Sequence, residues 1–307
     1  MARHLLSLSG LEPDALDRLL DLAATMKADP LGRRDALAGQ VVVLHFTKAS
    51  TRTRISFEAA IARLGGTPIF TRPDELQLGR GEPIADTARV LSRYAAAVVI
   101  RTFAHADVEE FARWSTIPVV NALTDAHHPC QALADLLTLR ERFGALRGLP
   151  VAYVGDGNNN VTHSLIEACA LAGVDLTVAS PAGHEPDARI VAGARDAAAR
   201  SGGQLEVVRD PREAVAHARA VYTDVFVSMG QEGEAAAKLA AFAGYQVDEA
   251  LLAGAADDAV FLHCLPAHRG EEVSDAVIEG ARSAVWDQAE NRLHTAAAVL
   301  LDLTGTA

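Results

Sequence analysis

The chain has 307 residues, 50% of them hydrophobic and 22% charged, which is typical of a globular protein with room for two domains. Its formal net charge of −12 argues against nucleic acid or an anionic membrane as a partner, because both would repel it. Three cysteines without a CxxC pair form no disulfide framework, and no apolar run reaches the ~18 residues of a membrane span, so we expect a cytoplasmic protein.

Short apolar runs rich in Val and Ile alternate with longer amphipathic patterns along the chain. The runs predict strands at 41–46, 67–70, 96–100, 117–121, 151–155, 176–179, 204–208, 220–224 and 259–263. Helical patterns lie between them, for example at 52–64, 84–94, 130–142 and 161–171. This alternation is typical of an α/β fold whose parallel sheets are covered by helices on both faces.

A candidate domain boundary lies in the segment FGALRGLP, residues 143–150, which carries two glycines and a proline just before a new strand. We therefore expect two doubly wound parallel-sheet domains, at 1–146 and 147–287. The closing pattern within 288–307 predicts a C-terminal helix that packs back on the first domain. Ligands of such sheets bind beyond the carboxyl ends of the strands, so motifs at those ends are candidate site residues.

The first such motif follows the strand VVVLHF and reads TKASTRTRISFEAAIARLGG. Ser50 or Thr51 is a natural N-cap, which places Arg52 and Arg54 in the first helical turn and Lys48 just before it. Cations at a helix N-terminus oppose the macrodipole unless an anion binds there as well. The residues alone are equally compatible with a capped helix whose arginines face solvent.

The segment FTKASTRTRISFE resembles the carbamoyl-phosphate loop of the aspartate and ornithine carbamoyltransferase family. The resemblance implies that four consecutive residues hold the phosphate, and that Arg54 is structural. These four are Ser50, Thr51, Arg52 and Thr53. Further matches lie in DELQLGRGE, VVIRTF, HHPCQALADLLTL and VWDQAENRLHT, and they add Gln77, Arg101, His128, Gln131 and Arg292 to the expected carbamoyl-phosphate site. By resemblance, Arg101, His128 and Thr53 polarise the carbamoyl oxygen, and Gln131 binds the carbamoyl amide.

The second half carries VAYVGDGNNNVTHS, which departs from a dinucleotide fingerprint because Asn160 stands at the third glycine position. The resemblance implies an asparagine ligand for ornithine, Asn160, with Asn159 as the alternative register. In VYTDVFVSMGQE it implies that Asp224 and Ser228 contact the α-amino group and that Met229 lines the pocket.

The segment FLHCLPAHRGEEV places Cys264 at the end of another predicted strand. A zinc site formed by His263, Cys264 and His268 and a buried inert thiol are the alternatives that the residues leave open. The resemblance implies instead that Cys264 lies near the reacting amine and the carbamoyl group, and that the Leu265 backbone holds that group. No metal or cofactor is expected, because arginines and a helix N-terminus supply positive charge.

The family resemblance of these motifs implies transfer of the carbamoyl group of carbamoyl phosphate to the δ-amine of L-ornithine, giving L-citrulline and phosphate in arginine biosynthesis. The expected catalytic residues are Cys264, Arg101, His128 and Asp224. The family also implies a homotrimer or a multiple of trimers. The alternatives are a carbamoyltransferase for another amine such as putrescine or an acetylated ornithine, a non-catalytic anion-binding relative, and a nicotinamide-dependent dehydrogenase.

Overall fold

The computed structural model describes residues 2–77, 81–227, 233 and 235–307. The chain divides into two compact units. The first comprises Met1–Gly10, Asp14–Leu137 and Glu290–Ala307, and the second comprises Leu11–Pro13 and Thr138–Ala289. No helix within the described ranges is both long enough and apolar enough to span a membrane.

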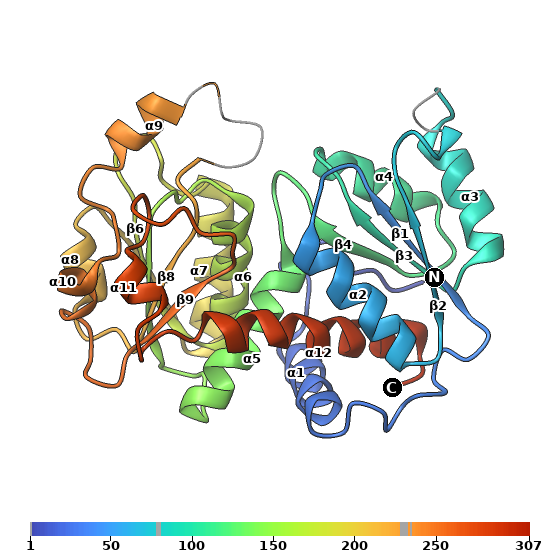
Figure 1. The fold of residues 1–307 in the computed structure, drawn as a ribbon, viewed down its shortest axis with the longest axis horizontal. Helices are drawn as coiled ribbons and strands as arrows, with labels where there is room; N and C mark the ends of the chain where they lie inside the picture. The colour runs from blue at the N-terminus through green and yellow to red at the C-terminus, as the bar shows by residue number, and fades with distance from the viewer. Residues whose placement is uncertain (1, 78–80, 228–232, 234) are drawn as a thin grey trace. The chain divides into compact units, whose positions relative to one another are not determined.

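The first unit is built on a sheet of four parallel strands in the order β2-β1-β3-β4 (Figure 1). Their bounds are Val41–Phe46 for β1, Thr67–Thr71 for β2, Ala97–Arg101 for β3 and Val119–Leu123 for β4. The helices of this part are α1 (Pro13–Ala28), α2 (Thr51–Arg63), α3 (Ile84–Tyr94), α4 (His105–Trp114) and α5 (Pro129–Phe143). All of β3 and all but one residue of β1 are buried, as their predominantly apolar sequences predict for strands covered on both faces.

The second unit is built on five parallel strands in the order β7-β6-β5-β8-β9. Their bounds are Pro150–Val154 for β5, Asp175–Ala179 for β6, Gln204–Val208 for β7, Ala220–Thr223 for β8 and Val260–His263 for β9. The helices are α6 (Asn160–Ala172), α7 (Ala188–Ser201), α8 (Pro211–Val215), α9 (Ala235–Ala241), α10 (Glu249–Leu252) and α11 (Asp275–Ile278), before the closing helix α12 (Val285–Thr304). The prediction of two doubly wound parallel α/β sheets is confirmed.

Every predicted strand is present, and the largest offset is in β4, which begins at Val119 instead of residue 117. Ser115 explains the delay, because its Oγ accepts from the amide of Ile117 at 3.2 Å and donates to the carbonyl of the same residue at 2.7 Å. This local turn occupies backbone groups that a strand would pair with its neighbour.

Strand order reverses between β1 and β3 in the first unit and between β5 and β8 in the second. At these switch points the connections leave toward opposite sides, which opens a crevice at the carboxyl ends of the two strands. The segment after β1 begins at Thr47 and β3 ends at Arg101. In the second unit, the segment after β5 begins at Gly155 and Asp224 follows β8. The fold therefore brings the predicted motifs of each unit to one edge of its sheet.

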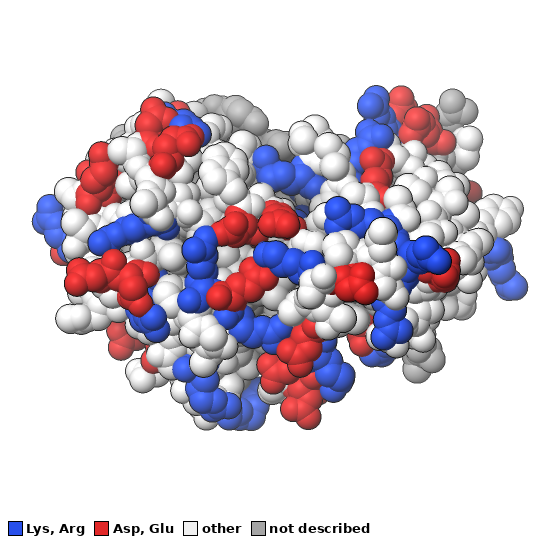
Figure 2. Space-filling model, turned by 60° about the horizontal axis from the view of Figure 1, so that its bottom comes forward, with Lys and Arg blue, Asp and Glu red and all other residues white. Residues whose placement is uncertain are grey.

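On the face drawn in Figure 2, acidic and basic side chains are interspersed over the described surface. The net charge of −12 is therefore not gathered into one acidic patch on that face.

Candidate active site

The N-terminus of α2 is capped as its sequence predicts. Ser50 is the N-cap residue, and its Oγ accepts from the amide of Thr53 at 3.3 Å. The first turn contains Arg52 and Arg54 and no acidic residue that would offset their charge. Arg54 donates from Nε to Glu58 Oε1 at 2.9 Å and stacks 3.6 Å above the ring of Phe70. This pairing fixes Arg54 on the helix surface, as expected for a structural residue.

A groove of about 640 Å³ runs beside this helix start. Its walls include Lys48, Ser50, Thr51, Arg54 and Arg72 together with Glu58 and Asp74. The Lys48 ammonium lies 3.8 Å from the centre of the Phe103 ring. Burial lowers the pKa of Lys48, Arg101 lowers it further, and Asp125 acts in the opposite direction. Cationic side chains thus line the groove beside the N-terminus of α2. This arrangement favours the binding of an anion.

A chain of buried hydrogen bonds joins three helices of the first unit. Arg292 in α12 donates from Nη1 to Gln131 Oε1 at 2.5 Å and from Nη2 to Thr53 Oγ1 at 3.0 Å. Gln131 in turn donates from Nε2 to Asp135 Oδ1 at 2.8 Å. The side chains that the family resemblance assigns to carbamoyl phosphate from α2, α5 and α12 therefore contact one another directly.

His128, just before α5, is buried among cationic groups. Burial lowers its pKa well below the ordinary value, and Arg292, Arg101 and Arg52 lower it further. The imidazole is therefore neutral near pH 7 and carries a single N–H donor. A neutral donor held beside arginines is suited to stabilise a carbonyl oxygen on which negative charge develops.

Two further residues of the first-unit motifs have different surroundings. Cys130 is buried, its thiol contacts the carbonyl of Asn121 at 3.4 Å, and burial raises its pKa to about 12, which makes it a poor nucleophile. Gln77 is exposed in the loop after β2, directly before residues outside the described ranges. Among the described residues, no hydrogen bond links the Gln77 side chain to the buried cluster.

In the second unit, Asn159 and Asn160 have different structural environments. Asn159 is the N-cap of α6, where Oδ1 accepts from the amide of Thr162 at 2.8 Å and Nδ2 donates to the carbonyl of Asp156 at 3.0 Å. Its amide is thus used by the fold. Asn160 is the first residue of α6 and is only half-buried. This geometry favours Asn160 over Asn159 as a ligand-binding residue.

Asp224 and Cys264 meet at the ends of neighbouring strands. Thr223 of β8 pairs with His263 of β9, so the residues that follow them emerge side by side. The Cys264 thiol donates to Asp224 Oδ1 at 3.0 Å. Burial raises the pKa of Asp224, against the opposing effects of His263 and the Cys264 hydrogen bond. A buried carboxylate with a raised pKa is a better proton acceptor than an exposed one.

The backbone after Cys264 is held in an unusual conformation by a buried pair. Leu265 has φ 58, in the left-handed region that a branched side chain occupies at a cost of ~1–2 kcal/mol. Its amide donates to His263 Nδ1 at 2.8 Å, and His263 Nε2 lies 3.2 Å from Glu272 Oε1. Both side chains of this pair are fully buried. They therefore fix the loop that carries Cys264 and Leu265.

The same contacts bear on the zinc alternative. Within the described ranges, two groups place three ligand atoms within 4.8 Å of one another, namely Asp224, His263 and Cys264, and His268, Glu271 and Glu272. Neither contains the set His263, Cys264 and His268. In the first group, both ring nitrogens of His263 already have hydrogen-bond partners, and Cys264 already donates to Asp224. Hydrogen bonding accounts for this proximity without a metal. Ser228 and Met229 lie outside the described residues.

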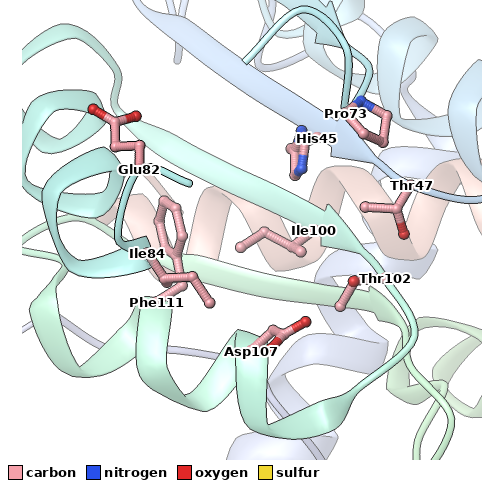
Figure 3. A pocket seen from close by; sticks show the side chains of 9 residues that line it. All are labelled: His45, Thr47, Pro73, Glu82, Ile84, Ile100, Thr102, Asp107 and Phe111. Carbon is pink, nitrogen blue, oxygen red and sulfur yellow. The ribbon is translucent and has the colours of Figure 1, made fainter. Parts of the chain in front are cut away.

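A second cavity of the first unit, about 300 Å³ in volume, shares Thr47 and Pro73 with the groove. Figure 3 shows the side chains that line this cavity. Ile84, Ile100 and Phe111 form much of its wall, and His45 and Glu82 supply polar groups. None of the residues predicted to bind carbamoyl phosphate is among its lining residues in the described ranges.

Comparison with known proteins decides the family. Residues 3–141 match the model of the aspartate/ornithine carbamoyltransferase carbamoyl-P binding domain, and residues 147–303 match that of the Asp/Orn binding domain. The chain belongs to the aspartate/ornithine carbamoyltransferase family. The resemblance drawn from its motifs is thereby confirmed.

Individual members of this carbamoyltransferase family are similar to the chain over its whole length. An ornithine carbamoyltransferase of Acidothermus cellulolyticus is 57% identical, and the alignment covers 99% of this chain and 98% of the relative. The structure of ornithine carbamoyltransferase from Pyrococcus furiosus is 48% identical and has a TM-score of 0.95, covering 99% of this chain and 97% of that one. The enzyme of the same name from Gloeobacter violaceus is 49% identical with a TM-score of 0.89, covering 98% of both chains.

Two carboxylates that support the site of this carbamoyltransferase were not predicted from sequence. Asp135 stands in the apolar run QALADLL four residues after Gln131, which is the spacing of side chains that meet on one helix face. Glu272 follows Glu271, which is only half-buried, and no sequence pattern separates the fully buried acid from its neighbour. The spacing of Asp135 from Gln131 is thus a sequence signal that could have identified Asp135, whereas the sequence holds no such signal for Glu272.

Proposed function

We propose that the chain transfers the carbamoyl group of carbamoyl phosphate to the δ-amine of L-ornithine, giving L-citrulline and phosphate. The carrying observation is the buried neutral His128 set among Arg52, Arg101 and Arg292 beside the N-terminus of α2. Three cations near one imidazole repel each other, and a bound anion would offset this repulsion. A doubly negative phosphate with an adjoining carbonyl matches it in both charge and hydrogen bonding.

The donor substrate would occupy the first unit. The amides and hydroxyls at the start of α2, together with Arg52, bind the phosphate, and the carbamoyl oxygen accepts from Thr53, Arg101 and His128. Gln131 accepts from the carbamoyl amino group, and Arg292 reaches the bound donor. The proposed carbamoyl-phosphate set is Ser50, Thr51, Arg52, Thr53, Gln77, Arg101, His128, Gln131, Cys264, Leu265 and Arg292.

The acceptor would be bound by residues of the second unit, Asn160, Asp224, Ser228 and Met229. The δ-amine resembles that of lysine, whose pKa is ~10.4, so deprotonating it at pH 7 costs about 4.6 kcal/mol. Burial around Asp224 disfavours charge and lowers this cost. Asp224 and Cys264 orient the amine, Asp224 accepts the proton that the ammonium loses, and the neutral amine then attacks the carbamoyl carbon. When the tetrahedral intermediate collapses, the bond to the phosphate oxygen breaks, and the departing phosphate takes up a proton from the nitrogen.

We further propose a homotrimer or a multiple of trimers that works in the cytoplasm in arginine biosynthesis. Large apolar side chains exposed on the first unit, Ile55 at 58%, Phe103 at 54% and Ile69 at 45%, are candidates for burial in such an assembly. Sedimentation equilibrium of the purified protein tests this assembly, and a monomer at micromolar concentration contradicts it.

The deciding experiment is a citrulline assay with carbamoyl phosphate and ornithine, run in parallel with putrescine and an acetylated ornithine. We expect turnover with ornithine at least ~10²-fold above either alternative amine, because a site built to hydrogen-bond the α-amino group leaves its polar groups unpaired when that group is missing. A bisubstrate phosphonate that joins the phosphoryl and ornithine moieties should inhibit strongly. Preferential turnover with another amine would show that the chain is a carbamoyltransferase for that amine. Binding of a nicotinamide cofactor without any carbamoyl transfer would favour a dehydrogenase.

A further inference from the structure

We propose that Asp135 is a positioning residue that holds the Gln131 side chain in the orientation that distinguishes the amino group of carbamoyl phosphate from a methyl group. The proposal rests on the proposed function of the site. It concerns the identity of the donor substrate, which the phosphate-binding groups cannot decide because every acyl phosphate carries the same phosphate.

The hydrogen-bond chemistry of the two neighbours fixes the Gln131 amide. An arginine only donates, so the Gln131 atom that faces Arg292 at 2.5 Å must be the oxygen. A carboxylate only accepts, so the atom that faces Asp135 at 2.8 Å must be the nitrogen. The two partners independently require the same orientation. All of these side chains are buried, with relative exposures of 2% for Gln131, 3% for Arg292 and 0% for Asp135.

The two partners differ in what they do when substrate binds. Arg292 belongs to the set proposed to reach carbamoyl phosphate, so its contact with Gln131 competes with the ligand. Asp135 is a helical neighbour of Gln131 in α5, four residues away, and it is fully buried. Its hydrogen bond to Nε2 therefore persists in the loaded site. It leaves Oε1 pointing away from Asp135 as an acceptor.

That acceptor gives the site its selectivity. The carbamoyl group ends in an amino group that donates, whereas the corresponding position of acetyl phosphate is a methyl group. An oriented Oε1 binds the first and gains nothing from the second. An amide free to rotate presents its NH₂ half of the time and repels the amino group. A carboxylate anchor is also stronger than a neutral one, because charge-assisted hydrogen bonds are roughly twice as strong.

The test compares three ligands in Asp135→Asn, an isosteric change that removes the charge. We expect the KM for carbamoyl phosphate to rise about tenfold, while the inhibition constants of acetyl phosphate and inorganic phosphate stay within about twofold of wild type. A merely structural role would weaken all three ligands together, and that result overturns the inference. Glu141→Gln, which removes an exposed acid from the same helix, is the matched control and should leave all three constants unchanged.

A double-mutant cycle shows whether Asp135 acts through Gln131. In a Gln131→Met background, Asp135→Asn should have no further effect on the ratio between carbamoyl phosphate and acetyl phosphate. A full effect in that background overturns the inference. If Asp135→Asn fails to fold, as judged by circular dichroism, Asp135→Ser shortens the side chain without adding bulk and serves in the same cycle. Wild-type protein that forms no citrulline contradicts the proposed function itself, whereas an active wild type with an unchanged ligand ratio in the variant contradicts only the role of Asp135.

Discussion

The thiol of Cys264 donates to Asp224 across 3.0 Å, at the ends of two strands that are neighbours in the sheet but lie 40 residues apart in sequence. Strand register alone produces this contact, because Thr223 and His263 are paired partners. The sequence motifs place both residues after strands, and the parallel topology brings them together. The pair is accordingly the best candidate for handling the proton of the attacking amine.

Asp224→Asn should lower kcat by about 10²-fold, the usual scale for loss of a positioned proton acceptor. Burial raises the pKa of Asp224, so wild-type activity should fall as pH drops through that raised value, and the variant should lack this acidic limb. A pH profile of kcat for both proteins, with the exposed Asp257→Asn as control, measures the difference. An unchanged profile in Asp224→Asn removes the residue from the chemistry.

Arg52→Ala should reduce kcat/KM for carbamoyl phosphate by at least ~10²- to 10³-fold and leave the fold intact, because it deletes a cation from the anion site. Arg54→Ala is a matched comparison on the same helical turn. It loses the pair with Glu58 and the contact with Phe70, and should cost stability of about 1 kcal/mol with little change in turnover. Steady-state kinetics and thermal unfolding separate the two outcomes. Equal kinetic losses in both variants contradict the assignment.

His128 should make the protein less stable in mild acid. Its folded pKa lies below the ordinary value of 6.5, so between pH 6.5 and that lower value the unfolded chain binds a proton that the folded chain does not. Stability is therefore lost as pH falls through this window, by up to about 1.4 kcal/mol per pH unit. Urea unfolding at pH 7.5 and 5.5 should show a smaller drop for His128→Gln than for wild type. Identical drops would mean that the imidazole titrates normally.

Lys238 and Asp156 form an ion pair of 2.7 Å in which the side-chain exposures are 10% and 2%. Lys238→Met should destabilise the second unit by about 3–5 kcal/mol, because it leaves the Asp156 carboxylate buried without its cation. Adding Asp156→Asn should recover part of this loss, which chemical denaturation of the single and double variants can measure. A cost below ~1 kcal/mol for Lys238→Met would show that the carboxylate finds another partner or water.

The sequence predicts the strands well because each central strand is a predominantly apolar run, as burial on both faces requires. It places β4 two residues early because the turn made by Ser115 is a side-chain event that apolar patterning does not register. It also leaves the choice between Asn159 and Asn160 open. Only the cap geometry of α6 shows that the Asn159 amide is used by the fold.

No local sequence pattern predicts the buried hydrogen-bonded cluster of the first unit. Arg292 is separated by 161 residues from Gln131 and by 239 residues from Thr53, yet it donates to both. Only the family resemblance connects these positions in the sequence. Asp135 was not predicted, for a different reason. Its spacing from Gln131 is a local signal, but a single acid in an apolar helix is equally typical of an exposed helix face.

The first unit is discontinuous, since its last portion is Glu290–Ala307, after the whole of the second. During synthesis the ribosome therefore releases every residue of the second unit before α12 can complete the first. Arg292 is the final member of the anion-binding cluster to emerge, so the nascent protein cannot bind its donor with full affinity until translation is almost finished. A premature stop at Glu290 keeps every residue of the second unit, and should yield a chain with an intact second sheet and an incomplete, aggregation-prone first unit.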